Sequence, residues 1–327
     1  MAPRPLSVLD LAIIRRDQTP GDAFEGCVSM AQRAEERGYQ RVWYAEHHNM
    51  SSVGSSAPAV LAAHVAAHTS SIRLGAGGVM LPNHSPLTIA EQYGTLAALH
   101  PGRIDLGLGR APGSDQAAAA AMRTSAQRSD RFPDDVAELQ AYLGDSTRVP
   151  GVEATPGKGS HVPLYILGSS LYGAQLAAAM GLPFAFASHF APESLQRAVA
   201  IYRAEFQPSE QLDAPYVIAA VNVLAADTDT DAQTQLQRVM RSRVARFLVK
   251  DRDLTDEEAD ALLASPQGRQ IAGMMRYLAV GTPGTVREYL SAFAEHADAD
   301  ELITAHASPT VEERLRSLDL TADVALV

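Results

Sequence analysis

Eight short apolar segments with the length and composition of buried strands alternate along this chain with eight segments of helical character. We expect the strands at residues 6–14, 41–48, 72–78, 103–109, 163–168, 184–188, 216–225 and 301–305. We expect the helices at residues 22–38, 56–69, 85–102, 132–144, 170–181, 192–206, 230–248 and 310–318. Because crossover helices join parallel strands, this order predicts an α/β fold, and eight repeats predict a closed (β/α)8 TIM barrel.

The chain has 327 residues, which exceeds the roughly 250 residues of a typical barrel of this kind. We place the surplus in three insertions, at about residues 109–131, 145–162 and 249–297. No linker-like stretch divides the chain, so the sequence predicts a single domain over residues 1–327.

Composition narrows the class of protein. The formal net charge of −11 disfavours nucleic acid and anionic membranes as partners. No apolar run reaches the roughly 18 residues that a membrane-spanning helix needs. The first residues show no long apolar region of a signal peptide, and the single cysteine, Cys27, allows no internal disulfide. We therefore expect a cytoplasmic enzyme.

The carboxyl ends of the strands, where TIM barrels build their sites, carry polar residues. Ser169 and Ser170 follow the fifth strand and precede a helix, a position typical of an N-cap and also of a phosphate-binding turn. The pair alone favours the cap. Arg110, at the end of the neighbouring fourth strand, offers a guanidinium that can bind a phosphate through two hydrogen bonds, which favours an anion site.

Histidines are the second polar group at these ends. His47 and His48 end the second strand, and strand alternation turns one of them inward, where a near-neutral imidazole suits proton transfer. An alternative is that His47, His48 and His84 converge on a metal, as in a TIM-barrel metal-dependent hydrolase. His64 and His68, one helical turn apart, lie on an expected outer helix, and we assign them no metal.

Glycines weaken the end of the third strand at Gly77 and Gly78. A backbone without Cβ atoms lets a flat ligand approach closely, and the alternative is a β-bulge at the rim of the barrel. Residues 75–80 and 107–113 approximate the dinucleotide-binding glycine motif but lack its third glycine and acidic partner, so they predict no Rossmann site.

Four stretches together carry a family resemblance, and they run from the second expected strand almost to the eighth. They are AEERGYQRVWYAEHHNM, IRLGAGGVMLPNHSPLTIAEQYGTLAALHPGRIDLGLGRAPGSDQ, YILGSSLYGAQLAAAMGLPFAFASHF and VGTPGTVREYL. On these residues the chain resembles the bacterial luciferase-like flavin-dependent oxidoreductases, in the group labelled MsnO8-like.

The resemblance implies a TIM barrel with FMN as cofactor, a non-prolyl cis peptide under the flavin ring and a phosphate-binding turn. Residues matching the family's cofactor site are Gly77, Gly78, Arg110, Ser169, Ser170, Gly173 and Ser188, and His47 matches the histidine near the reactive edge of the flavin. In the turn, Ser169 stands where the luciferases carry an acidic residue. The region near residues 249–280 corresponds to a lid in relatives.

The activity implied is that of a monooxygenase that uses reduced FMN and O2 on a small organic substrate. A homodimer and a separate flavin reductase are further implications. Two alternatives stay within the family: hydride transfer with the deazaflavin F420, whose acidic tail favours extra basic residues near the mouth, and a flavin-binding relative without activity.

Overall fold

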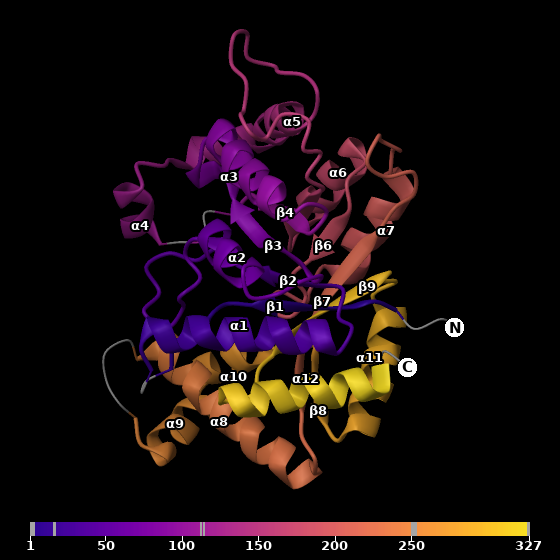
Figure 1. Cartoon of the computed structure of the whole chain (residues 1–327). Helices are drawn as coiled ribbons and strands as arrows, with labels where there is room; N and C mark the ends of the chain where they lie inside the picture. Colours follow the sequence, from indigo (N-terminus) through magenta and orange to yellow (C-terminus); the bar gives the residue numbers. More distant parts are fainter. Residues whose placement is uncertain (1–3, 16–17, 112, 114, 250–253, 326–327) are drawn as a thin grey trace.

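The computed structural model describes residues 4–15, 18–111, 113, 115–249 and 254–325, and it confirms the closed parallel barrel of eight strands (Figure 1). Strands pair in the order β6-β5-β4-β3-β2-β1-β9-β7, and β6 pairs with β7 to close the barrel. The strands are β1 (Leu6–Asp10), β2 (Arg41–Tyr44), β3 (Arg73–Met80), β4 (Ile104–Gly109), β5 (Leu164–Gly168), β6 (Phe184–Phe186), β7 (Val217–Ala225), β8 (Leu278–Gly281) and β9 (Glu301–His306).

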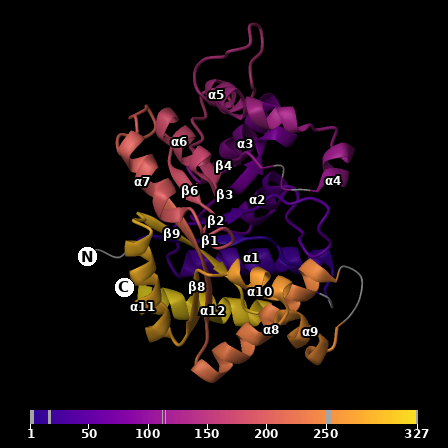
Figure 2. The same ribbon diagram turned by 180° about the vertical axis from the view of Figure 1, so that it is seen from behind.

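Helices surround the barrel, and Figure 2 shows α6 and α7 beside β6. The α-helices are α1 (Pro20–Glu36), α2 (Pro58–Ala66), α3 (Pro86–Leu99), α4 (Gln116–Ala121), α5 (Phe132–Leu143), α6 (Leu171–Met180), α7 (Leu195–Glu205), α8 (Asp229–Leu248), α9 (Asp256–Leu263), α10 (Pro266–Gly273), α11 (Pro283–His296) and α12 (Val311–Ala325). Two short 3-10 helices, η1 (Leu81–Asn83) and η2 (Ala126–Arg131), complete them. None of the helices in these described ranges is long and apolar enough to cross a membrane.

Each of the eight predicted strands is present, but several end earlier than expected. The first ends at Asp10 rather than residue 14, because the carboxylate Oδ1 of Asp10 accepts the N–H of Ala12 at 2.9 Å and Ala12 takes a positive φ of 49°. Asp10 is buried and also pairs with Arg314 of α12 at 2.9 Å. The strand end is thus fixed by a side chain that competes with backbone pairing.

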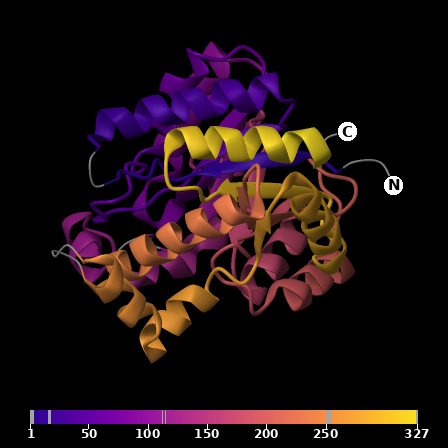
Figure 3. The same ribbon diagram turned by 90° about the horizontal axis from the view of Figure 1, so that it is seen from below.

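The helix predicted at residues 230–248 is confirmed as α8, which contacts β7 and β8. A further helix that was not predicted, α11, also contacts β7; it packs against α12, and its His296 accepts hydrogen bonds from Gln196 of α7. Helix α8 forms, with α9 and α10, a helical group on one side of the barrel (Figure 3).

The expected insertion at 249–297 therefore contains α9, α10, β8 and α11, with residues 250–253 outside the described part. Strand β8 was not predicted. It pairs in parallel with the last four residues of β7, with Leu278 opposite Asn222 and Gly281 opposite Ala225. Its four residues are short enough to escape a periodicity search.

Large apolar side chains fill the middle of the barrel. Leu9, Trp43, Tyr165, Ile218 and Ile303 belong to one buried cluster, and the rings of Trp43 and Tyr165 meet edge to face at 4.9 Å between centroids. A larger cluster lies between the strands and the surrounding helices. The barrel is therefore a packed core whose ligand site must lie at an end.

A buried ionic network closes the amino-terminal end of the barrel. The Arg41 guanidinium on β2 lies 2.8 Å from the carboxylate of Asp105 on β4 and 2.9 Å from that of Glu301 on β9. Tyr165 accepts a further bond from Arg41 at 2.7 Å, and its ring lies under the guanidinium. Burial, with the charge of Asp105, raises the pKa of Tyr165 to about 12, so the phenol stays protonated.

Replacing Arg41 with methionine tests the network. The change leaves the buried carboxylates of Asp105 and Glu301 without their shared cation, so we expect a loss of about 3–5 kcal/mol in the free energy of unfolding. Trp43, the only tryptophan, lies against Asp105 and reports the transition by fluorescence in urea. The control Arg316→Met breaks the exposed pair with Asp227 and should cost at most about 1 kcal/mol. Equal losses in the two variants would contradict the role of the network.

Candidate active site

Glu46, directly after β2, organises the opposite, carboxyl-terminal end of the barrel. Its buried carboxylate accepts hydrogen bonds through Oε1 from His48 at 2.9 Å and from His84 at 2.8 Å. Its Oε2 accepts the backbone N–H of Met80, at the end of β3, at 3.0 Å. Burial alone would raise the pKa of Glu46, but the hydrogen bonds from His84 and His48 lower it overall. The ionised carboxylate thus joins the ends of β2 and β3.

The same contacts argue against the metal-hydrolase hypothesis. The Nε2 atoms of His48 and His84 both face Glu46, and His47 is not part of that contact. Across the residues that the structure describes, no group of three His, Cys, Asp or Glu side chains is arranged to hold a metal ion. His64 lies on α2 and His68 follows the end of that helix, with their ring centroids 4.7 Å apart.

His47 has a different environment. Its backbone N–H is fixed to the carbonyl of Ser55 at 3.0 Å, while its buried Nδ1 has no hydrogen-bond partner within the described chain. Burial lowers the pKa of His47 below 6.5, against a smaller opposing effect from Glu46. The imidazole is therefore neutral at pH 7 and free to accept a proton.

His189, just beyond β6, lies close enough to His47 for their charges to interact. Its Nδ1 is also buried without a partner among the described residues, and its backbone carbonyl accepts the side-chain amide of Asn222 at 2.6 Å. Burial, with the charges of Arg243 and His47, lowers the pKa of His189 to about 4. Two neutral imidazoles therefore occupy the mouth of the barrel.

Gly77 and Gly78 are joined by a cis peptide bond, as the family resemblance implies. The pairing of β3 with β4 also shifts between Ala76 and Val79, so the β-bulge alternative is present as well. A Cβ on Gly78 would lie 2.7 Å from the carbonyl oxygen of Gly107, and one on Gly77 would lie 2.9 Å from the Cβ of Trp43. Close packing against neighbouring strands is thus sufficient reason for glycine at both positions.

The turn between β5 and α6 is open at its helix end. Ser169 and Ser170 are exposed, and the hydroxyl of Ser170, at the N-cap position, makes no capping hydrogen bond. The first turn of α6 has no acidic residue, so its N–H groups and the helix dipole present a positive end. Gly168 and Gly173 bring their backbones together, since a Cβ on Gly173 would lie 3.5 Å from the Cα of Gly168.

Arg110 lies over this turn. Its guanidinium carbon is 4.3 Å from the ring centroid of Tyr172, in the first turn of α6, and its Nε donates to the carbonyl of Ser129 at 3.1 Å. Its ion pair with Asp130, at 3.5 Å, is largely exposed and correspondingly weak. A phosphate can therefore displace Asp130 and bind between the guanidinium and the helix N-terminus.

Ser188 is placed differently from the other predicted site residues. It is fully buried, and its hydroxyl donates to the carbonyl of Ala220 on β7 at 2.5 Å. This bond ties the end of β6 to β7, so the hydroxyl hydrogen is already used within the protein. Tyr172 is a residue that the sequence reasoning missed. The i, i+2 spacing of Tyr172 after Ser170 gives no signal that a distant arginine stacks on it.

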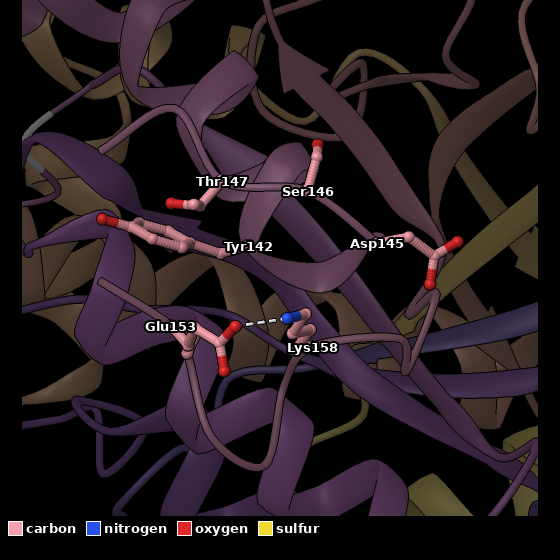
Figure 4. A pocket seen from close by; sticks show the side chains of 7 residues that line it. Tyr142, Asp145, Ser146, Thr147, Glu153 and Lys158 are labelled. Carbon is pink, nitrogen blue, oxygen red and sulfur yellow. Dashed lines mark hydrogen bonds and ion pairs between the residues drawn. The ribbon is translucent and has the colours of Figure 1, made fainter. Parts of the chain in front are cut away.

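A surface cavity of about 240 Å³ lies among residues 142–158, between the end of α5 and the start of β5 (Figure 4). It is lined by Tyr142, Asp145, Thr147, Glu153 and Lys158, and Lys158 pairs with Glu153. It shares no residue with the site built from the predicted residues.

The fold and the comparison with protein families agree on the class of protein. The chain matches the model of the luciferase-like monooxygenases over residues 6–300. The chain belongs to this family.

Relatives extend the family assignment over the full chain. A luciferase-like monooxygenase of Escherichia coli (strain K12) is 43% identical over 97% of this chain and 96% of its own length. An N-acetyl-S-alkylcysteine monooxygenase of Bacillus subtilis (strain 168) is 32% identical over 98% of each chain. The crystal structure of apo-MsnO8 superposes with a TM-score of 0.87 at 34% identity and 98% coverage of both chains.

Replacing Glu46 with glutamine tests the organisation of the mouth. The neutral amide cannot accept charge-assisted bonds from both histidines, so we expect the free energy of unfolding at pH 7 to fall by about 1–3 kcal/mol. Because the pKa of Glu46 is lowered on folding, wild type should lose this advantage as the pH falls below 4.5. Glu25→Gln, at an exposed position of α1, is the control and should change nothing measurable. Indistinguishable urea curves for Glu46→Gln and wild type would refute the assignment.

Proposed function

We propose that this protein is a flavin-dependent monooxygenase that binds reduced FMN at the barrel mouth and uses O2 to oxidise a small organic substrate. Membership of the luciferase-like monooxygenase family supports the reaction class. The observation that carries the cofactor assignment is the stacking of Arg110 on Tyr172 above the open turn of α6. Reduced flavin, when bound, supplies the electrons that activate O2.

The phosphate of FMN would bind between Arg110 and the N-terminus of α6, where Ser169, Ser170 and the backbone near Gly173 offer donors. The chain runs from Arg110 back through Gly109 to Gly107, whose carbonyl lies against Gly78. The cis peptide on β3 is therefore one strand away from Arg110, the residue that we propose binds the phosphate. The flavin ring would then extend from Arg110 toward Gly77, Gly78 and the end of β2.

His47 would hold or move a proton at its Nδ1, the buried atom that has no protein partner in the described chain. His189 would place a second neutral ring at the mouth of the barrel. This ring would help to exclude water from the site without adding a charge to it. Residues of the α8–α10 group would complete the enclosure of the substrate.

F420 remains the alternative cofactor, because its ring and phosphate suit the same surface. Proteins of this fold include one crystallised with FMN and one with an F420–acetone adduct, each 17% identical to this chain, a likeness that shows the fold alone. The number of basic residues does not distinguish FMN from F420. Arg123, Arg128 and Arg131 follow Arg110 in the expected insertion, so basic residues that could meet an acidic tail are present. We favour FMN on the monooxygenase name shared by the relatives.

The remaining parts of the proposal are a cytoplasmic homodimer, a single domain, and a separate reductase that supplies reduced flavin. Val60 on α2 and Leu99 on α3 are 70% and 65% exposed, which leaves apolar surface that a second copy would cover.

Cofactor binding is tested by titrating the protein with FMN, riboflavin and F420, oxidised and reduced, and recording absorbance under anaerobic conditions. We expect reduced FMN to bind, and Arg110→Gln to weaken FMN at least tenfold while leaving riboflavin unchanged, because only FMN carries the phosphate. Ser169→Asp should weaken FMN through charge repulsion. Arg131→Gln, at a 68% exposed side chain after the same loop, is the control. Equal FMN affinity in Arg110→Gln and wild type would exclude the proposed phosphate site between Arg110 and the N-terminus of α6.

The role of His47 is tested by His47→Asn. We expect FMN affinity to be retained and coupled turnover to fall by about 100-fold or more. In wild type, turnover should decline as the pH falls through the lowered pKa of His47, below 6.5, where the imidazole becomes protonated. The control His64→Asn changes an exposed histidine on α2. Unchanged coupled turnover in His47→Asn would remove the histidine from the mechanism.

A further inference from the structure

Arg110 is bonded to a residue of the insertion that follows it. Its Nε donates to the carbonyl of Ser129 in η2 at 3.1 Å, and the hydroxyl of Ser129 donates to the carbonyl of Arg110 at 3.4 Å. Ser129 is therefore joined to both the side chain and the backbone of Arg110. Because the Ser129 carbonyl takes the Nε proton, the terminal amino groups are the part of the guanidinium that remains to meet an anion.

The bond to Ser129 decides the direction of the Arg110 guanidinium. The side chain of Arg110 is 41% exposed, so solvent leaves it many rotamers. Stacking on Tyr172 fixes the distance of the guanidinium from that ring but lets the group rotate in its own plane. A hydrogen bond from Nε to a fixed carbonyl removes this rotation. The position of η2 therefore sets where the terminal amino groups point.

The helix η2 is in turn anchored on the segment that follows β3. The Nη2 of Arg128 donates to the carbonyl of His84 at 3.0 Å, and the hydroxyl of Thr124, just before η2, donates to the carbonyl of Pro82 at 3.1 Å. The imidazole of His84 is itself held by Glu46 at 2.8 Å. A path of hydrogen bonds thus runs from the buried carboxylate after β2, through His84 and Arg128, to the residue that orients Arg110.

We propose that Arg128 is a positioning residue for the cofactor phosphate: it anchors η2 to His84, so that the Ser129 carbonyl turns the guanidinium of Arg110 toward the N-terminus of α6. This inference rests on the proposed function, because it takes the phosphate to bind at that terminus. Arg128 and Ser129 are neighbours in the chain, so a displacement of the anchor moves the carbonyl that orients Arg110.

A direct contact between Arg128 and the phosphate is the competing interpretation. Arg128 is bonded to the segment after β3, whereas the turn with Ser169 and Ser170 follows β5, and β4 with Arg110 lies between those two strands. The two interpretations also differ in what they predict for double variants. A second ligand contributes its own binding free energy, whereas a positioning residue has an effect only while Arg110 is present.

The experiment is a double-mutant cycle on flavin affinity. Reduced FMN and reduced riboflavin are titrated under anaerobic conditions into the full chain with Arg128→Met, with Arg110→Gln and with both changes. We expect Arg128→Met to weaken FMN about fivefold or more and to leave riboflavin within about twofold of wild type, because riboflavin lacks the phosphate. In the Arg110→Gln background, Arg128→Met should change FMN affinity by less than about twofold.

Two further variants control for charge and for the lost donor. Arg123→Met removes the same charge from an exposed position of the same insertion and should leave FMN affinity unchanged. Arg128→Lys keeps a donor for the His84 carbonyl and should recover most of the affinity that Arg128→Met loses.

Three results of this cycle would overturn the proposal. Unchanged FMN affinity in Arg128→Met would remove Arg128 from the site. Equal losses of FMN and riboflavin would assign it a general structural role. Additive losses in the double variant would make it a direct ligand of the phosphate.

A measurement without flavin follows Arg110 itself. In the 15N-labelled protein, the Nε–H signal of Arg110 is assigned by its loss in Arg110→Gln, and its hydrogen exchange with water is recorded. The bond to Ser129 slows this exchange in wild type, and we expect Arg128→Met to accelerate it about fivefold or more and Arg123→Met to leave it unchanged. Equal exchange rates in Arg128→Met and wild type would refute the anchoring of Arg110 by Arg128.

The two proposals fail in different ways. If exchange accelerates as expected but wild type binds no flavin, the proposed function falls, and the phosphate with it, while the anchoring of Arg110 by Arg128 stands. If wild type binds reduced FMN and Arg128→Met binds it equally well, only the positioning role is lost.

Discussion

The ion pairs of Arg41 with Asp105 and Glu301 fix the closed end of this barrel, and the open end depends on that closure. The three residues come from β2, β4 and β9, so one guanidinium links strands around the barrel wall. All three side chains are buried, so removing one partner would leave a buried charge with neither a counter-ion nor water to stabilise it. Above this layer Trp43 packs on Tyr165, and the interior is filled up to the level of the cis peptide.

The mouth follows the opposite design. At the floor, each buried charge has a partner of opposite sign, whereas at the mouth buried polar atoms are left without one. Glu46 binds His48 and His84, and the buried Nδ1 atoms of His47 and His189 have no hydrogen-bond partner within the described chain. Polar atoms of this kind are available to a bound ligand, which accords with the proposed flavin site.

The barrel could be predicted from the sequence because each strand is a short apolar run followed by a helix with a recognisable start or stop. The positions of Arg110, Ser169 and Ser170 at one edge followed from the same rule, since parallel strands bring their carboxyl ends together. The helix at α8 was predicted, but its packing against α9 and α10 was not, because an amphipathic pattern is the same whether the partner is the barrel or another helix pair.

Other features depended on contacts between residues far apart in the chain. Nothing local to Glu46 signals that two histidines and the N–H of Met80 converge on it. The pairing states of the α8 arginines are equally invisible in sequence, since Arg241 and Arg243 differ only in which way the helix turns them. The glycines at the end of β3 were recognised, but their contacts with Trp43 and Gly107 required the three-dimensional arrangement.

The way β8 lies on β7 has a consequence for how such a protein can diversify. Ala225 stands opposite Gly281, and the N–H of Ala226 donates to the carbonyl of Gly281 at 3.0 Å. The chain therefore leaves the end of β7 and returns beside it through β8, and the described residues in between, 227–249 and 254–277, carry α8, α9 and α10. A segment attached in this way can be exchanged for one of another length without moving a barrel strand, so that new substrates become accessible while the cofactor platform is inherited intact.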